Sequence, residues 1–150
     1  MALKKGDILP DFALPDQEGV DFSHTDLKKG SPVVIYFYPK DFTPGCTKEA
    51  CSFRDRYQDF QSMGAEVIGV SSDSVSRHQR FREKFSLPFR LLSDKDGSLR
   101  KKFGIKDQLF GLLPGRETFV FDRDHRLAHR FNSMQSSPHI TQALKVLERL

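Results

Sequence analysis

The run from Val33 to Tyr38, Val-Val-Ile-Tyr-Phe-Tyr, constrains the fold more than any other segment of the chain. It is apolar at every position, and such a run is typical of a strand that is covered on both faces of a sheet. The turn that follows, Pro39-Lys-Asp-Phe-Thr-Pro-Gly-Cys46, ends at a cysteine, and a helix is expected from Thr47 to about Met63. Cys46 is therefore expected at a junction between a buried strand and a helix.

Strand and helix patterns alternate along the rest of the chain. The other expected strands are 11–14 and 20–22, which form an N-terminal hairpin, then 66–71 and 89–92, and finally 118–121 and 127–131, which form a second hairpin. The other expected helices are a short turn at 26–30, a helix over 74–85, one from Asp94 or Asp96 to Phe103, and one that begins at Ser137.

This order predicts an α/β fold with a mixed sheet and helices on both of its faces. Strands joined by a crossover pair in parallel, whereas the closing hairpin must be antiparallel. We expect residues 1–150 to form one domain. Reactive sites in such sheets lie at the carboxyl ends of the strands, and this is where Cys46 is expected.

Composition and charge exclude several classes of protein. No apolar run approaches the roughly 20 residues that span a bilayer, and the N-terminus lacks the apolar stretch of a secretory signal. The net charge of +4 comes from Lys and Arg residues that alternate with acidic residues, so we expect no nucleic-acid partner. We expect a cytoplasmic protein with no membrane partner.

The two cysteines, Cys46 and Cys51, are too few for a secreted disulfide scaffold and are more typical of a catalytic or redox role. At the start of a helix, unpaired backbone N–H groups and the helix dipole favour negative charge. This environment stabilises the thiolate, which is the reactive form of cysteine. The alternative for Cys46 is a buried and inert cysteine, which is common for this residue type.

Several motifs resemble those of one enzyme family. Pro39-x-x-x-Thr43-x-x-Cys46 resembles the active-site signature of the peroxiredoxins, and the segment from Tyr36 to Asp55 resembles the peroxiredoxin Q, or bacterioferritin-comigratory, subfamily. Gly6-Asp-x-x-Pro-Asp-Phe12 and Arg116-Glu-Thr-Phe-Val120 also fall where that family has equivalents. The resemblance covers essentially the whole chain and implies a thioredoxin-like fold with an N-terminal extension.

The resemblance implies roles for the residues around the turn. Cys46 would be the peroxidatic cysteine, whose thiolate attacks one oxygen of the O–O bond. Thr43 would contact the peroxide and the thiolate, although a threonine before a helix is usually only a cap. Pro39 would shield the thiolate from water, and Gly45 would permit close approach of the chain and the substrate.

Arg116 and Glu49 are implied as supporting residues. In the family, an arginine in the setting of Arg116 lies against the cysteine and the peroxide oxygens, and its guanidinium donors suit both contacts. Composition alone would leave Arg116 as a surface charge. Glu49 matches a glutamate that holds this arginine, but a glutamate in the first turn of a helix is also favoured by the helix dipole.

Cys51 would resolve the sulfenic acid of Cys46 as an intramolecular disulfide. Five residues along an ideal helix place two Cα atoms roughly 8–9 Å apart, whereas a disulfide tolerates about 7 Å at most. We therefore expect the first helical turn to unwind before the bond closes.

The resemblance implies hydrogen peroxide and alkyl hydroperoxides as substrates, a thioredoxin-like reductant, antioxidant defence, and no cofactor. We expect a monomer or a weak dimer. Phe42 departs from the subfamily, which more often has a small polar residue there, and the change bears on the polarity of the pocket rim. The apolar segment Leu109–Pro114 is expected to pack on the core, with the pocket or a partner surface as alternatives.

Other chemistries fit the sequence less well. Two cysteines and five scattered histidines do not have the spacing of a metal site. A disulfide oxidoreductase of the thioredoxin type would use Cys-x-x-Cys, and Cys51 lies two residues too far from Cys46. A non-catalytic binding module that uses an apolar patch such as 110–113 is the alternative from another class.

Overall fold

A five-stranded mixed sheet forms the centre of the computed structural model, which describes residues 3–105, 116–133, 135 and 137–150. In order across the sheet, the strands are β5 (Arg90–Ser93), β4 (Glu66–Ser71), β3 (Val33–Phe37), β6 (Glu117–Phe121) and β7 (Leu127–Asn132). β3, β4 and β5 run parallel, and β6 is antiparallel to both β3 and β7. The predicted α/β class and mixed sheet are confirmed.

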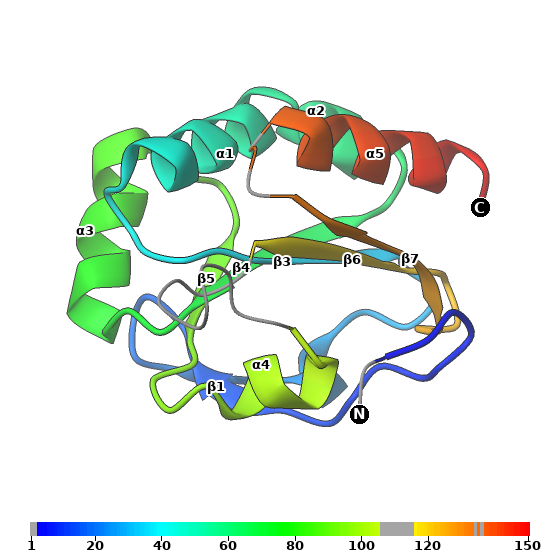
Figure 1. Cartoon of the computed structure of the whole chain (residues 1–150), viewed down its shortest axis with the longest axis horizontal. Coiled ribbons are helices and arrows are strands. Elements are labelled where there is room, and N and C mark those ends of the chain that lie inside the picture. Colours follow the sequence, from blue (N-terminus) through cyan, green and yellow to red (C-terminus); the bar gives the residue numbers. More distant parts are fainter. Residues whose placement is uncertain (1–2, 106–115, 134, 136) are drawn as a thin grey trace.

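Helices cover both faces of this sheet. They are α1 (Pro44–Asp55), α2 (Tyr57–Ser62), α3 (Val75–Phe85), α4 (Ser98–Phe103) and α5 (Ser137–Glu148). Figure 1 shows α1, α2 and α5 on one face of the sheet and α4 on the other. A separate hairpin of β1 (Ala13–Pro15) and β2 (Asp21–Ser23) lies on the α4 side, which confirms the predicted N-terminal extension.

The central strand β3 contributes to two hydrophobic cores. Val34 and Tyr36 belong to the core under α1 and α5, whereas Val33, Ile35 and Phe37 belong to the core under α4 and the N-terminal hairpin. Successive side chains of a strand point to opposite faces, so a continuous apolar run is typical of a strand that is covered on both faces. All five residues of β3 are buried, as predicted from their sequence.

The predicted helix over 47–63 is wrong in its start and in its continuity. Helix α1 already begins at Pro44, because proline is well suited to the first helical position, where no N–H donor is needed. The helix is interrupted at Arg56, whose φ of −104° and ψ of 10° are not helical, and α2 follows. Phe53 and Phe60 still pack together, with ring centroids 5.5 Å apart, so the apolar period continues across the break.

Smaller boundaries also differ from the sequence prediction. The short helical turn expected at 26–30 lies at His24–Asp26 as a 3₁₀ helix, because Ser23 and Asp26 form a reciprocal capping box there. Gly97, rather than Asp94 or Asp96, is the N-cap of α4. The two aspartates instead accept hydrogen bonds from backbone N–H groups of the first turn of α4.

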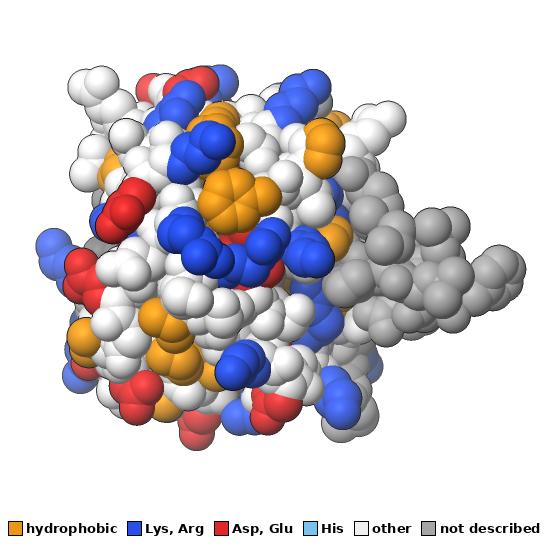
Figure 2. Space-filling model, turned by 90° about the vertical axis from the view of Figure 1, so that its left-hand side faces the viewer, with side chains coloured by type: hydrophobic (Ala, Val, Ile, Leu, Met, Phe, Trp, Pro, Cys, Tyr) orange, Lys and Arg blue, Asp and Glu red, His pale blue; other side chains and the backbone are white. Residues whose placement is uncertain are grey.

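The surface on the α3 side mixes side chains of all kinds. Figure 2 shows Lys and Arg side chains around apolar side chains near the centre of this face, with Asp and Glu side chains among and around them. This pattern fits the interpretation of the excess positive charge as a solvated surface. Among the residues that the structure describes, no helix is both long and apolar enough to cross a membrane.

Replacement of Gly69 tests how tightly β4 is packed. A Cβ atom at Gly69 would lie 2.9 Å from the Tyr36 ring and 2.9 Å from Leu91 Cδ2. We expect Gly69→Ala to lower the free energy of unfolding by about 1–3 kcal/mol, because overpacking displaces buried side chains. Denaturant unfolding measures this loss.

The Tyr36 hydroxyl makes no hydrogen bond within the described part of the chain, so its removal provides a matched second variant. The double variant Tyr36→Phe/Gly69→Ala should recover part of the stability, since the hydroxyl oxygen is one of the three close atoms. A Gly69→Ala protein as stable as the unmodified chain would show that this packing argument is wrong.

Candidate active site

Cys46 lies in the first turn of α1, directly after the loop that leaves β3. Thr43 is the N-cap residue, Pro44 is the first helical residue, and the Thr47 N–H donates to the Thr43 carbonyl at 2.8 Å. The N–H groups of Gly45 and Cys46 belong to the first turn, which lacks helical acceptors. Only 1% of Cys46 is exposed, so the thiol lies within the protein at the positive end of a helix dipole.

Arg116 connects Cys46 with Glu49. Its Nη2 donates to Cys46 Sγ at 3.3 Å, and its Nη1 donates to Glu49 Oε1 at 2.5 Å. Arg116 directly precedes β6, and the antiparallel register pairs Phe37 of β3 with Glu117. The end of β3 and the start of β6 therefore meet at one edge of the sheet. The structure thus places Cys46, Glu49 and Arg116 together, as the resemblance implied.

The charges of this group are strongly coupled. Burial raises the pKa of Glu49 to about 8, although Arg116 acts in the opposite direction. Burial of Arg116 acts to lower its pKa, but the charges of Glu49 and Cys46 outweigh this effect and raise it. One guanidinium therefore contacts two acidic groups, Cys46 and Glu49.

His139 is a neighbour of Glu49 that the sequence did not reveal as part of the site. Burial lowers the pKa of His139 to about 4, so the ring is neutral near pH 7. Its Nε2 lies 2.7 Å from the Ser133 carbonyl and must donate, so Nδ1 accepts from the Thr118 hydroxyl at 2.7 Å. Nδ1 also lies 3.8 Å from Glu49 Oε2 but has no proton to give. Glu49 Oε2 is buried without a hydrogen-bond partner among the described residues.

His139 shows why the sequence could not reveal this contact. In the sequence it is one of five scattered histidines. Nothing in the sequence around it indicated its burial or the element that it would contact.

The remaining residues of the turn lie beside this group in different ways. The Thr43 hydroxyl donates to the Lys40 carbonyl at 2.8 Å and does not cap α1, although Thr43 occupies the N-cap position. A Cβ atom at Gly45 would lie 3.0 Å from Arg116 Nη2, so glycine leaves room for the guanidinium. Pro39 is half-buried, just after the end of β3.

Cys51 lies five residues beyond Cys46 on the same helix. Both cysteines are free, Cys51 is half-buried, and α1 is continuous from Pro44 to Asp55. Phe42 has a positive φ of 67° and is 38% exposed. Its ring lies against Phe81 of α3, with centroids 5.1 Å apart. The predicted apolar segment 109–114 lies outside the described residues.

The raised pKa of Glu49 predicts how stability depends on pH. The carboxyl releases its proton near pH 4.5 in the unfolded chain and near pH 8 in the folded protein, and the pKa is raised by burial. Between these values the folded state binds more protons than the unfolded state. Stability contributed by this group is therefore complete below about pH 4.5 and falls as the pH rises through about 8.

Glu49→Gln should remove this component, because the amide oxygen still accepts from Arg116 but has no proton to lose. Guanidinium unfolding of both reduced proteins gives the free energy of unfolding at about pH 5 and at about pH 8.5. The decrease between these two pH values should be larger in the unmodified chain than in Glu49→Gln by about 2–4 kcal/mol. An equal loss in both proteins would contradict the raised pKa.

Comparisons with known proteins identify the family of the chain. The AhpC/TSA family model matches residues 5–130. The chloroplastic peroxiredoxin Q of Sedum lineare is 50% identical over 147 residues, which cover 97% of this chain and 78% of that protein. The chloroplastic peroxiredoxin Q of Oryza sativa subsp. japonica is 48% identical over 149 residues, which cover 99% of this chain and 68% of that protein.

Solved structures give the same result. Peroxidoxin BcpB from Mycobacterium tuberculosis is 40% identical and superposes with a TM-score of 0.89, over 99% of this chain and 98% of that one. Peroxiredoxin Q from Xanthomonas campestris is 32% identical with a TM-score of 0.84, over 92% of this chain and 90% of that one. The chain therefore belongs to the AhpC/TSA family and, within it, to the peroxiredoxin Q proteins, which makes it a peroxidase.

Proposed function

We propose that the chain is a two-cysteine thiol peroxidase that reduces hydrogen peroxide and alkyl hydroperoxides in antioxidant defence. The observation that carries the proposal is the contact of Arg116 Nη2 with the buried Cys46 Sγ at the start of α1. A guanidinium and a helix N-terminus both favour the thiolate. A structure of the bacterioferritin comigratory protein of Xanthomonas campestris is described for its alkyl peroxide reduction activity, which supports the organic substrates.

In the first step, the Cys46 thiolate attacks one oxygen of the peroxide and breaks the O–O bond. Cys46 becomes a sulfenic acid, and the other oxygen leaves as an alcohol or as water after it takes up a proton. Arg116, together with the backbone N–H groups near Cys46, stabilises the negative charge that develops on the oxygens. Thr43 helps to bind the peroxide, Gly45 leaves space for it, Pro39 shields the thiolate, and Glu49 holds Arg116.

In the second step, the Cys51 thiol condenses with the sulfenic acid, and a disulfide and water are formed. Both cysteines lie on one continuous helix, five residues apart, where the ideal separation of roughly 8–9 Å exceeds the reach of a disulfide. The first turn of α1 must therefore unwind before the disulfide forms. A dithiol reductant of the thioredoxin type then restores both thiols.

Three further parts of the proposal come from the sequence alone. Residues 1–150 act as one domain, the protein is a monomer or a weak dimer, and no metal or cofactor takes part. The sequence also predicts a cytoplasmic location, and the plant relatives named above are chloroplastic proteins. The location therefore stays a prediction.

Replacement of each cysteine tests the two-step cycle. After one equivalent of hydrogen peroxide, the intact mass of the unmodified chain should fall by two hydrogens, with a Cys46–Cys51 link in the peptide map. Cys46→Ser should abolish peroxide consumption. Cys51→Ser should allow the first oxidation, gain one oxygen on Cys46, and then stall with a thioredoxin-type reductant.

Other results would change the assignment. An oxygen gained by the unmodified chain on Cys46 alone would keep the peroxidase but remove Cys51 from the mechanism. No reaction with peroxide would favour the binding-module alternative. A disulfide found with α1 intact from residue 46 onward, by hydrogen exchange or by a structure of the oxidised protein, would refute the unwinding step.

Arg116→Lys tests the role of the guanidinium. Lysine keeps one charge but cannot contact Cys46 and Glu49 with two separate donors of a planar group. We expect the rate constant for oxidation of Cys46 by hydrogen peroxide to fall about 100- to 1000-fold, the range found when one transition-state donor is removed. Stopped-flow fluorescence or competition with a reporter peroxidase measures this rate.

Arg130→Lys is the matched control, because Arg130 also pairs with a buried glutamate, Glu117. Its guanidinium lies over the ring of Phe119, which belongs to the core on the other face of the sheet from Cys46. This control should leave the rate unchanged. Equal rates for Arg116→Lys and the unmodified chain would contradict the proposed role of Arg116.

A further inference from the structure

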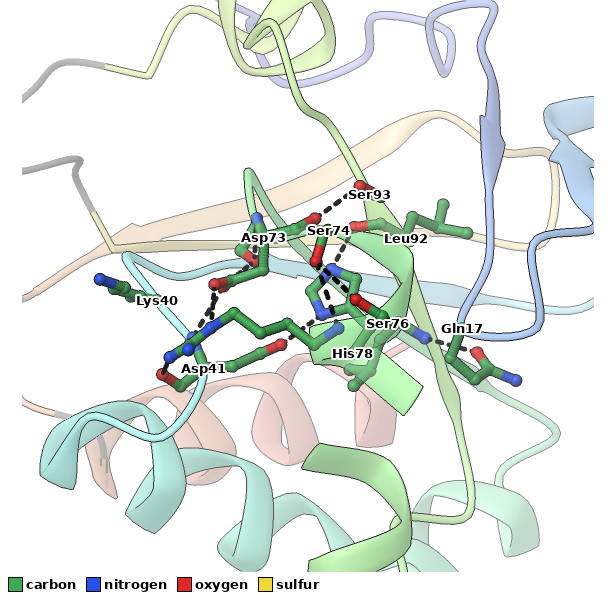
Figure 3. A network of polar contacts seen from close by, with 12 residues as sticks. Gln17, Lys40, Asp41, Asp73, Ser74, Ser76, His78, Leu92 and Ser93 are labelled. Carbon is green, nitrogen blue, oxygen red and sulfur yellow. Dashed lines mark hydrogen bonds and ion pairs between the residues drawn. The ribbon is translucent and has the colours of Figure 1, made fainter. Parts of the chain in front are cut away.

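A second buried polar network lies beside the active-site turn and has no role in the chemistry above. It is centred on Asp41, which is fully buried two residues before Thr43. Figure 3 shows Asp41 and Asp73 close to His78 of α3, with Leu92 and Ser93 on the adjoining strand. We refer to Tyr38, Asp41, Asp73, Arg77 and His78 as the Asp41 network.

The hydrogen bonds of His78 define its protonation. Its Nε2 lies 3.0 Å from the Leu92 carbonyl, which can only accept, so Nε2 carries a proton. Its Nδ1 lies 2.6 Å from Asp41 Oδ2, so a second proton must lie between these two atoms. Without that proton, two lone pairs would face each other at short range within the core.

Asp41 receives a further donor from the strand end. The Tyr38 hydroxyl donates to Asp41 Oδ1 at 2.5 Å. Burial, followed by the charge of Asp41, raises the pKa of Tyr38 well above its ordinary value, so Tyr38 remains a neutral donor. Asp41 therefore accepts short bonds on both carboxylate oxygens, as an ionised carboxylate does when it faces an imidazolium and a phenol.

The backbone of Asp41 is held as firmly as its side chain. Its N–H donates to Asp73 Oδ2 at 2.7 Å, and its carbonyl accepts from Arg77 Nη2 at 2.8 Å. Asp73 in turn accepts from Arg77 Nε at 2.9 Å. Arg77, whose side chain is partly exposed, therefore pairs with the buried Asp73 and at the same time holds the backbone of Asp41.

The ligand atoms of Asp41, Asp73 and His78 lie within 4.8 Å of one another, close enough to hold a metal ion. Their hydrogen bonds give a different account of the cluster. Asp73 Oδ2 accepts from the Ser71 hydroxyl at 2.7 Å as well as from the Asp41 N–H, and Oδ1 accepts from Arg77. Proton donors thus already satisfy these atoms, so the cluster is a closed polar network that holds the loop.

The position of Asp41 links this network to Cys46. Phe42, the next residue, has a φ of 67°, a left-handed conformation that costs a bulky residue roughly 1–2 kcal/mol. Thr43 is then the N-cap residue of α1, and its hydroxyl donates to the Lys40 carbonyl. Fixed contacts at Asp41 can hold this unfavourable conformation, and the conformation sets where α1 begins and where Thr43 and Cys46 lie.

We propose that the Asp41–His78 pair is a charged positioning element for the peroxide reaction, with His78 present as an imidazolium. The proposal rests on the proposed peroxidase function and adds two positioning residues, neither of which touches the peroxide. The pair holds the turn from Pro39 to Thr43 so that Thr43 and the first turn of α1 face the substrate. The reaction of Cys46 with peroxide needs this alignment, whereas a reaction that needs only the thiolate depends on it less.

Asp41→Asn is the variant that tests the pair. An asparagine amide can accept from Tyr38 and donate to a neutral His78, so the hydrogen bonds are kept while the charges are lost. We expect the rate constant of Cys46 with hydrogen peroxide to fall about 10- to 100-fold. Alkylation of Cys46 by iodoacetamide needs no alignment of a peroxide. Its rate constant in the variant should stay within about threefold of that of the unmodified chain, which corresponds to roughly 0.7 kcal/mol in activation free energy.

Asp11→Asn is the matched control. Asp11 also pairs with a histidine, His24, with Asp11 Oδ1 3.2 Å from His24 Nε2, but this pair lies on the surface near the N-terminal hairpin. The control variant should react with both reagents as the unmodified chain does.

Nitrogen-15 NMR of the histidine rings of the unmodified, reduced protein provides a test that needs no variant. Both ring nitrogens of His78 should show the shifts of protonated nitrogen at about pH 7, whereas a neutral ring has one unprotonated nitrogen. The signal should change to that of a neutral ring in Asp41→Asn.

Three results would overturn the proposal. The first is an unprotonated Nδ1 of His78 in the unmodified protein, and the second is an unchanged peroxide rate constant in Asp41→Asn. The third is an Asp41→Asn protein in which the peroxide and iodoacetamide rate constants both fall and the folding stability is also lower. The last result would indicate a merely structural role. Failure of the peroxidase function is distinguishable, because the unmodified chain would then not react with peroxide while the NMR signature of His78 would remain.

Discussion

The burial of β3 on both faces is the constraint on which the rest of the structure depends. All five residues of β3 are buried and contribute to the cores on both faces of the sheet, and β3 lies at its centre between β4 and β6. β4 is parallel to β3, and β6 is antiparallel. The carboxyl end of β3 and the amino end of β6 therefore coincide, and this brings the Cys46 turn and Arg116 to one edge across 70 residues of sequence.

Buried charge is the second organising feature, and around the active-site turn it is paired with side chains from distant elements. Arg116 is shared by Cys46 and Glu49, and Asp41 is shared by Tyr38, His78 and the side chains that hold its backbone. Removal of an ion from water is costly, so such groups are retained in a core only with close partners. The two networks lie on either side of the same turn. One concerns the charge of the thiol, and the other concerns the conformation of the loop that presents it.

The parts of the fold that followed from the sequence were those with a strong local signal. The apolar run of β3, the alternation of strands and helices, and both hairpins are confirmed within the described residues. The break at Arg56 could not be foreseen, because Phe53 and Phe60 keep the helical period across it. The start of α1 was misplaced by three residues, since the favourable position of Pro44 in the first turn was not weighed.

The site divides in the same way. The amino-acid sequence by itself indicated Cys46 as the reactive residue, because a cysteine after Thr-Pro-Gly at a strand–helix junction is a local pattern. The role of Arg116 was implied only by the resemblance of its motif to the peroxiredoxin family. Only the tertiary structure decided which groups serve them: His139 beside Glu49, and His78 with Asp73 around Asp41. These contacts join residues 32 to 90 positions apart, and no local pattern encodes such a pairing. They arise when the sheet and its helices pack and each buried polar atom must find a partner.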